Sequence, residues 1–154
     1  MPGLLAFFSR YGYAPNTMPK GQMRVPSTLR RSPKKAEETY EKTLERAEET
    51  YRGDEKRAHR VAWSAVKHSF EKKGDRWEPK RKRGPSDPHA ASGGPDPRGE
   101  SFGGVDIEGK RKDELQREAR RLGVHVTSRM TKKELGREIA RANTRATRKD
   151  RRGH

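Results

Sequence analysis

The stretch 53–79 constrains the fold of this chain most, because apolar residues are dense enough there to be surrounded by one another. On a helical wheel the apolar side chains of residues 58–70 cover an unusually wide arc, which is typical of a helix packed on several sides. Gly74 ends this helix, and Trp77 follows in a short segment just before Pro79. We expect this segment to be extended and to fold back, so that the Trp77 indole covers the same core.

A second helix is predicted just upstream, as the packing partner of the first. Ser32 and Pro33 suit the N-cap and the first turn, and the apolar residues that follow recur every three or four positions. Gly53 ends this helix and Asp54 caps the next, which predicts a helical hairpin. Residues 25–29 are expected to be a short strand or an extended entry. The outer face of the upstream helix is acidic, with Glu37, Glu38, Glu41, Glu45, Glu48 and Glu49. The predicted core residues are Tyr40, Leu44, Tyr51, Ala58, Ala62, Trp63, Ala65, Val66, Phe70 and Trp77.

A specific motif runs through residues 25–80. It consists of Asp54-Glu55, the run Arg57-Ala58-His59-Arg60-Val61-Ala62-Trp63-Ser64-Ala65-Val66-Lys67-His68, and Gly74-Asp75-Arg76-Trp77, with Leu29 and Ser32-Pro33 upstream. These residues resemble the ChaB family. The resemblance implies a small α-helical domain with a minor strand pair, and the family is named for regulation of a cation/proton antiporter. It implies no catalytic residues.

Composition limits how much of the chain can fold around a core. Only 27% of the 154 residues are hydrophobic and 39% are charged, too polar a mixture to fill a core of that length. Residues 81–105 are rich in proline and glycine and are predicted to be a flexible linker. Residues 1–23 are interpreted as a disordered or miscalled extension, because Met18 offers a second start and the apolar run 4–8 is too short for a secretory signal.

A second ordered unit is predicted at 106–146, with a helix, an extended loop and another helix. Gly123 ends the first helix, and Thr131 with Glu134 forms a capping box for the second, where Met130 is placed to pack on Leu135. The unit is similar to the N-terminal domain of the termination factor Rho and, more loosely, to SAP modules. The residues that carry this similarity are Lys112-Asp113-Glu114-Leu115, Ala119, Leu122-Gly123-Val124 and the run 128–135. Gly136 weakens the second helix by about 1 kcal/mol relative to alanine. Residues 147–154 are predicted to be a basic disordered tail. The fold class is therefore mainly α, with a helical hairpin, a minor strand pair, a linker and a helix–loop–helix module.

Charge indicates a polyanionic partner. The chain has a formal net charge of +16, and residues 103–154 hold 16 Lys or Arg and 8 Asp or Glu, a net +8 (16 minus 8). Arginines there recur about a helical turn apart on one arc, a spacing that can follow a phosphate backbone. The candidate nucleic-acid-binding residues are Arg129, Lys132, Lys133, Arg137, Arg141, Arg145 and Arg148. DNA and RNA are not distinguished.

Enzymatic chemistry has no signature in this sequence. It contains no phosphate-binding glycine loop, no nucleophile elbow, no HExxH motif and no cysteine. His59 and His68 lie nine residues apart on opposite sides of their helix, so they are not a ligand pair. We expect no catalytic residue, no metal and no cofactor.

The expected function is that of a non-enzymatic nucleic-acid-binding accessory protein, whose C-terminal module contacts phosphate and whose ChaB-like domain recruits a protein partner. The alternative is a regulator of a cation/proton antiporter at the cytoplasmic face of the membrane, with the basic arm on anionic lipid. A structural dimer formed through the Tyr40 and Tyr51 stripe is a third reading. No run is long enough for a transmembrane helix, so a cytoplasmic location is expected, with nucleoid association as an option.

Overall fold

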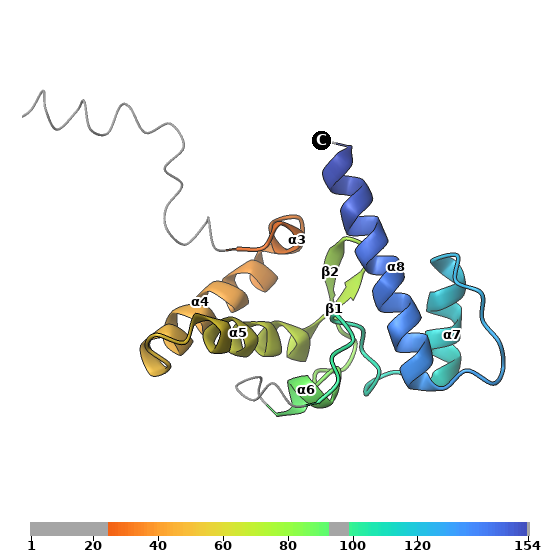
Figure 1. Ribbon diagram of the computed structural model, residues 1–154, viewed down its shortest axis with the longest axis horizontal. Helices are drawn as coiled ribbons and strands as arrows, with labels where there is room; N and C mark the ends of the chain where they lie inside the picture. Colours follow the sequence, from red (N-terminus) through yellow and green to blue (C-terminus); the bar gives the residue numbers. More distant parts are fainter. Residues whose placement is uncertain (1–24, 93–98, 154) are drawn as a thin grey trace, which may run out of the picture.

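The computed structural model describes residues 25–92 and 99–153 (Figure 1). The chain is mainly helical with a single two-stranded antiparallel sheet in the described part, which confirms the predicted fold class. The predicted extension at 1–23 and part of the predicted linker, residues 93–98, lie outside the described residues. In chain order the elements are α3 (Ser27–Arg30), α4 (Lys34–Thr50), α5 (Glu55–Ser69), β1 (Phe70–Lys73), β2 (Arg76–Pro79), α6 (Pro88–Ala91), α7 (Lys112–Arg121) and α8 (Lys132–Arg152).

Helices α4 and α5 form the predicted hairpin. Gly53 has a positive φ of 85° in the turn between them, a conformation that glycine adopts without steric cost. Asp54 then caps α5, and its side chain accepts a hydrogen bond from the backbone nitrogen of Arg57 at 2.9 Å. The apolar stripes of the two helices face each other and bury Tyr40, Leu44, Ala58, Ala62 and Val66.

The strands β1 and β2 return the chain over this hairpin. Lys72 pairs with Trp77 across the two strands. The Trp77 side chain is 3% exposed and stacks on Trp63, with ring centroids 5.2 Å apart. Trp63 in turn lies 5.0 Å from the Tyr40 ring. Trp77 therefore closes the core, as its position after the helix suggested. Of the other residues predicted for this core, Phe70 is buried, and Tyr51, Trp63 and Ala65 are half-buried.

Residues 25–29 differ from the prediction, because Ser27–Arg30 is a helical turn and not a strand. The Pro26 carbonyl accepts hydrogen bonds from the backbone nitrogens of Leu29 and Arg30. The turn buries Leu29 completely and places the Thr28 hydroxyl 3.4 Å from the Trp77 indole nitrogen. Burial of Leu29 in the same core as Trp77 depends on tertiary packing that the residues of the segment do not reveal.

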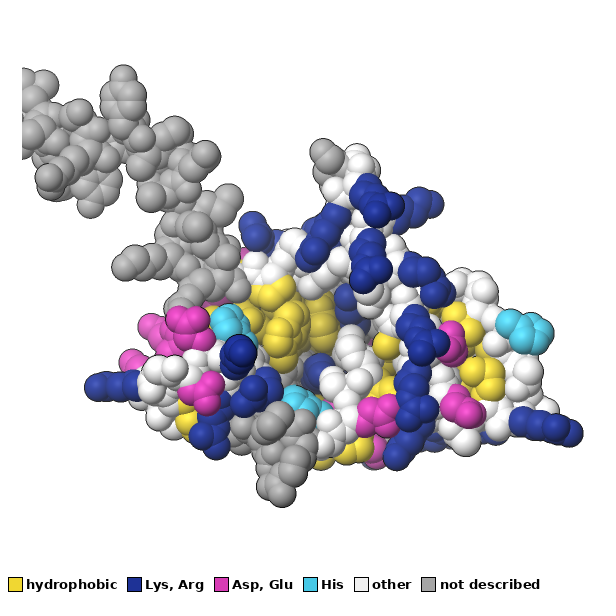
Figure 2. All heavy atoms as spheres, viewed as in Figure 1, with side chains coloured by type: hydrophobic (Ala, Val, Ile, Leu, Met, Phe, Trp, Pro, Cys, Tyr) yellow, Lys and Arg dark blue, Asp and Glu magenta, His cyan; other side chains and the backbone are white. Residues whose placement is uncertain are grey.

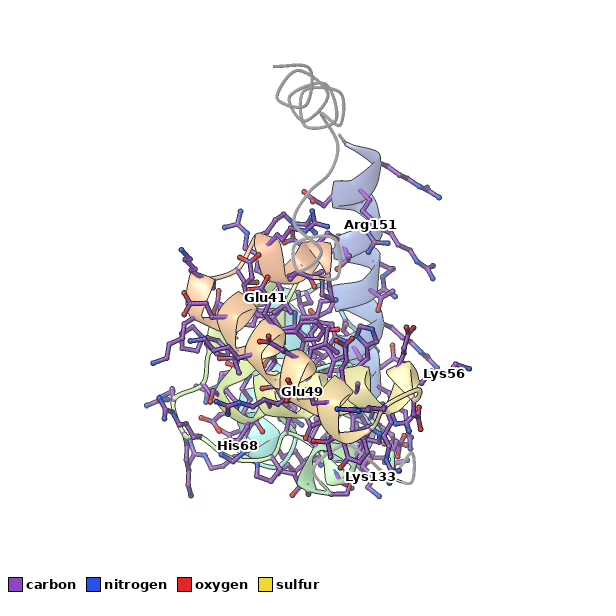
Figure 3. All side chains as sticks on the ribbon, turned by 90° about the vertical axis from the view of Figure 1, so that its left-hand side faces the viewer. Glu41, Glu49, Lys56, His68, Lys133 and Arg151 are labelled. Carbon is purple, nitrogen blue, oxygen red and sulfur yellow. The ribbon has the colours of Figure 1, made fainter. Side chains whose placement is uncertain are left out.

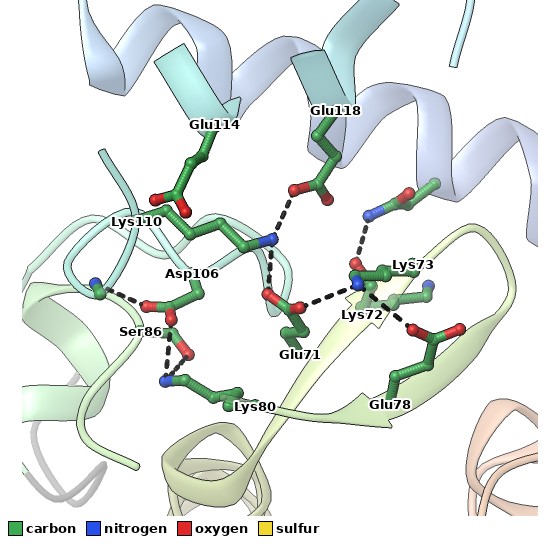
Figure 4. Close-up of polar contacts among 12 residues, drawn as sticks. Glu71, Lys72, Lys73, Glu78, Lys80, Ser86, Asp106, Lys110, Glu114 and Glu118 are labelled. Carbon is green, nitrogen blue, oxygen red and sulfur yellow. Dashed lines mark hydrogen bonds and ion pairs between the residues drawn. The ribbon is translucent and has the colours of Figure 1, made fainter. Parts of the chain in front are cut away.

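The predicted flexible linker 81–105 is wrong for its described residues. The Lys80 ammonium, from the residue just before this segment, donates hydrogen bonds to the carbonyl of Gly84 (2.6 Å) and the hydroxyl of Ser86 (3.1 Å). It also lies 3.4 Å from the Asp106 carboxylate, just after the segment (Figure 4). Asp87 is fully buried and accepts from the backbone nitrogens of Ala90 and Phe102. Proline and glycine content predicted disorder here, but buried polar groups that satisfy one another hold the segment against the hairpin.

A second core joins this segment to α7 and α8. Its buried residues are Phe102, Val105, Ile107, Leu115, Ala119, Leu135 and Ile139. Gly104 adopts a φ of +90°, and a β carbon there would lie 2.3 Å from the Trp77 ring. The backbone at Gly104 therefore touches the aromatic cluster of the hairpin. The two cores meet at this contact.

The predicted disordered tail at 147–154 is also wrong over most of its length, because α8 continues to Arg152. Thr147 is buried, and the Asp150 carboxylate lies 3.3 Å from the Arg31 guanidinium. Arg31 also pairs with Asp75 at 3.1 Å. In the sequence, this run of cations is typical of a solvated tail. In the structure, Asp150 within the run forms an ion pair with Arg31, more than a hundred positions away.

The packing around position 136 requires a glycine, although glycine is unfavourable in the interior of a helix. A β carbon on Gly136 would lie 2.6 Å from Ile107 Cγ2 and 2.9 Å from Phe102 Cδ1, and both of these side chains are buried. The substitution Gly136→Ala gains about 1 kcal/mol of helix propensity but forces an overpacked contact that costs about 1–3 kcal/mol. We expect a net loss of about 1 kcal/mol in the free energy of unfolding, measured by urea denaturation.

The matched control for this prediction is Thr144→Ala, an exposed position of the same helix. It should change the free energy of unfolding by less than about 0.5 kcal/mol. A stabilised Gly136→Ala variant would show that Ile107 and Phe102 can move aside.

Candidate nucleic-acid interface

Helix α8 carries most of the candidate residues, and its start is set by local sequence. The Thr131 hydroxyl accepts from the backbone nitrogen of Glu134 at 3.2 Å, and the Glu134 carboxylate accepts from that of Thr131 at 2.7 Å. This is the predicted capping box. The buried side of the helix consists of Leu135, Gly136, Ile139, Ala142, Asn143 and Thr147.

Asn143 holds α8 against the strand pair. Its side-chain amide donates to the carbonyl of Lys72 at 2.9 Å and accepts from the backbone nitrogen of Gly74 at 2.8 Å. Both groups belong to the turn region of the strand pair, and Asn143 itself is 1% exposed. These hydrogen bonds fix the rotation of α8 about its axis, and with it the direction in which the arginines of the helix point.

The side of α8 opposite Asn143 is a row of arginines, which we call the arginine ridge. Its members are spaced four, four, three and four residues apart, which keeps them on one helical face. All are exposed, and Figure 2 shows dark blue side chains aligned along α8. The ridge is about 22 Å long at 1.5 Å per residue. It consists of Arg137, Arg141, Arg145, Arg148 and Arg152.

The two ends of the ridge differ in their ion pairs. Arg137 forms a bidentate pair with Glu100, at 2.6 and 3.1 Å, and Arg141 lies 2.8 Å from Glu138. The hydrogen bonds from Arg137 lower the pKa of the Glu100 carboxyl. In the described part of the chain no ion pair is found for Arg145, Arg148 or Arg152. The arginines in the C-terminal half of the ridge can therefore bind phosphate without first breaking an ion pair to a described residue.

The other predicted binding residues lie near the start of α8. Arg129 is exposed in the loop before it, and Lys133 is exposed one turn before Arg137, in line with the ridge. Lys132 is half-buried on the side of the helix that packs inward. Arg152 was missed, because the helix was expected to end earlier. The four-residue spacing from Arg148 to Arg152 could have indicated that Arg152 continues the row of arginines.

The opposite end of the molecule presents an acidic surface on α4. Figure 3 looks onto this helix and labels Glu41 and Glu49 on it, with α8 and Arg151 behind. Tyr40, Leu44 and Ala47 are buried on the inner side of α4. Of the glutamates predicted to face solvent, Glu45 and Glu49 are exposed, and the other four are half-buried. The molecule therefore separates a basic helix from an acidic one, although its net charge is strongly positive.

The histidines form no ligand set. The His59 ring nitrogen Nδ1 lies 2.6 Å from the Tyr40 hydroxyl, and His68 is exposed. Among the residues that the structure describes, no group of three or more His, Asp or Glu side chains could hold a metal ion. His59 belongs to the aromatic cluster that includes Tyr40 and Trp63.

The hairpin and the strand pair lie in the part of the chain that matches a family model. Residues 25–80 match the ChaB family model. The match covers α3, α4, α5, β1 and β2, and ends at Lys80, whose ammonium donates a hydrogen bond to the Gly84 carbonyl. The ChaB-like domain is therefore the part of the chain that contains the acidic helix and the aromatic cluster, whereas the arginine ridge lies outside it.

The remaining comparisons are negative. No curated protein and no solved structure matches the chain. The resemblance of residues 106–146 to the Rho N-terminal domain is not confirmed and stays a prediction. Within the described residues, no helix combines the length and apolar character needed to cross a membrane.

Proposed function

We propose that this protein is a non-enzymatic nucleic-acid-binding accessory factor that contacts phosphate groups through the arginine ridge. The observation that carries the proposal is the exposure of Arg145, Arg148 and Arg152 on one face of α8 without an ion pair in the described chain. Arginines that follow one another every turn can lie along a phosphate backbone, where they act without regard to base sequence. The ChaB-like domain then serves to recruit a partner.

The test is a salt titration of the full chain with a random DNA duplex and with a single-stranded RNA. The three unpaired ridge arginines, with Arg129, Lys133 and Lys149, make six candidate contacts on exposed positions. Six phosphate contacts give a slope of about −5 in log affinity against log salt for a duplex. An affinity that does not depend on salt, or no binding at about 0.1 M salt, contradicts the proposal.

Substitutions are better suited to this test than truncations. Deleting residues 103–154 would remove Asp106, the partner of the Lys80 ammonium, and Gly104, which touches the Trp77 ring. A loss of binding in that deletion could arise from damage to the ChaB-like domain. Charge changes at exposed ridge positions leave both cores intact.

Regulation of a cation transporter is the second candidate, and the match of residues 25–80 to the ChaB family favours it. In that case the acidic surface of α4 would meet a basic loop of the transporter, and the ridge would lie on anionic lipid at about 1 kcal/mol per cation near the surface. A full chain that ignores nucleic acid but binds anionic vesicles would favour this candidate over the first.

A further inference from the structure

A second basic surface lies in a groove between the strand pair and α7, away from the ridge. The groove has a volume of about 630 Å³. Figure 4 shows its floor, where the Lys110 ammonium lies between Glu118 of α7 and Glu71 of β1, and Lys73 lies on the other side of Glu71. Arginines of α7 and Arg81, just after β2, also line it.

Each carboxylate on the floor already has an ion-pair or hydrogen-bond partner within the chain. Glu71 lies 2.6 Å from the Lys110 ammonium and 3.2 Å from that of Lys73, and Glu118 lies 2.5 Å from Lys110. Glu114 accepts a hydrogen bond from the backbone nitrogen of Arg111 at 2.8 Å, which lowers the pKa of its carboxyl. Lys110 and Lys73 offset two of the three carboxylate charges of the floor, so the four arginines of the rim are the dominant charge.

Three of the four rim arginines have no ion pair with a described residue. Arg81, Arg120 and Arg121 are exposed and form no ion pair with any described residue, and Arg117 pairs only with the exposed Asp113, at 3.1 Å. Six cations and three carboxylates line the groove, so its lining has a net charge of +3 (6 minus 3). Like-charged arginines held around a hollow attract an anion with several oxygens, such as a phosphate group.

The groove and the ridge lie on different sides of α8. The buried side of α8 packs on the strand pair through Asn143 and on α7 through the second core. The ridge is on the opposite side of the same helix, turned away from both elements that form the groove. One straight nucleic-acid segment lying along the ridge therefore does not also fill the groove.

We propose that the groove between the strand pair and α7 binds phosphate groups of a second nucleic-acid segment, so that one molecule bridges two segments. This inference rests on the proposed function, because the first segment lies on the ridge. The rim arginines Arg81, Arg120 and Arg121 are the residues that meet the second backbone.

The test is a capture assay, in which a bead-bound random duplex coated with the full chain retains a free fluorescent duplex. The groove variant is the triple substitution Arg81→Glu, Arg120→Glu and Arg121→Glu. The matched control is Arg46→Glu, Arg52→Glu and Lys56→Glu, which changes the charge equally at exposed positions of the ChaB-like domain. Anisotropy of a single labelled duplex measures ridge binding separately. The groove variant should lose capture about 10-fold while its affinity for a single duplex falls less than about 3-fold.

The outcomes separate this inference from the proposed function. Capture that the groove variant retains, or that the control loses equally, overturns bridging through the groove. A wild-type chain that binds one duplex but captures no second one also overturns it, and the proposed function stands. A wild-type chain that binds no duplex at all overturns both.

Discussion

Replacing Arg145 and Arg148 by glutamate is expected to weaken binding to a random duplex by about 100-fold at about 0.1 M salt. For each phosphate contact, the affinity rises by a factor of about 10 to the power 0.9 for each 10-fold decrease in salt concentration below 1 M. At about 0.1 M salt, each contact therefore contributes roughly a factor of eight to the affinity. Two lost contacts give about 60-fold, and the repulsion by two new carboxylates adds to it. The salt slope should become shallower by about two units. Fluorescence anisotropy over a salt series measures both quantities.

Two controls separate a phosphate contact from net charge. The pair Arg46→Glu and Arg52→Glu makes the same charge change on exposed positions near the C-terminal end of α4. Figure 1 shows that this end of the hairpin lies away from α8. This control pair should lower the affinity less than about 5-fold, because surface charges beyond a Debye length are screened. The pair Arg145→Lys and Arg148→Lys should restore most of the binding, since lysine also neutralises phosphate. Equal losses in the control pair and in the ridge pair would mean that the chain binds only by its overall charge.

Truncating Trp77 to alanine is expected to lower the free energy of unfolding by about 3–5 kcal/mol. Its ring is 3% exposed, stacks on Trp63 and touches the backbone at Gly104. The substitution opens a cavity where the two cores meet, so both lose packing. Urea denaturation followed by circular dichroism measures the change without relying on tryptophan fluorescence.

The comparison variants for Trp77 are Trp77→Phe and Trp63→Ala. The first keeps an aromatic ring in the site and should cost less than the alanine variant. Trp63 is only half-buried, so its truncation should cost less than that of Trp77. A Trp77→Ala variant that loses less than about 1 kcal/mol would show that the ring is not the contact that joins the cores.

Local patterns predicted the α4–α5 hairpin of the ChaB-like domain and the arginine face of α8. They were wrong for Ser27–Arg30, which is helical, and for Phe70–Lys73, which is strand β1 and not the end of the helix. Helical periodicity places residues three and four apart on one side, so the stripe around Tyr40 and the arc from Arg137 to Arg148 could be found without any tertiary information. Caps have equally local signals, and Asp54 and Thr131 start their helices as predicted. The motif in residues 25–80 likewise indicated the family that the comparison found.

Local sequence patterns could not predict contacts between residues that are distant in the sequence. The predicted linker packs because Lys80 meets Asp106, and the predicted tail is helical as far as Arg152, with Asp150 beside Arg31. In each of these ion pairs the two residues are too far apart in the sequence for a local pattern to predict the contact.

By itself, then, the sequence determined which residues share a helical face, where most helices start, and that half of the charge excess lies in the last third. Only the tertiary structure decided which ridge arginines have an ion pair with a described residue, since Glu100 reaches Arg137 from a segment expected to be a flexible linker. It also decided that the strand pair and α7 enclose a basic groove. The physical reason is the same in both cases, because ion pairing and groove shape depend on how separate elements pack, whereas periodicity and capping act within a few residues.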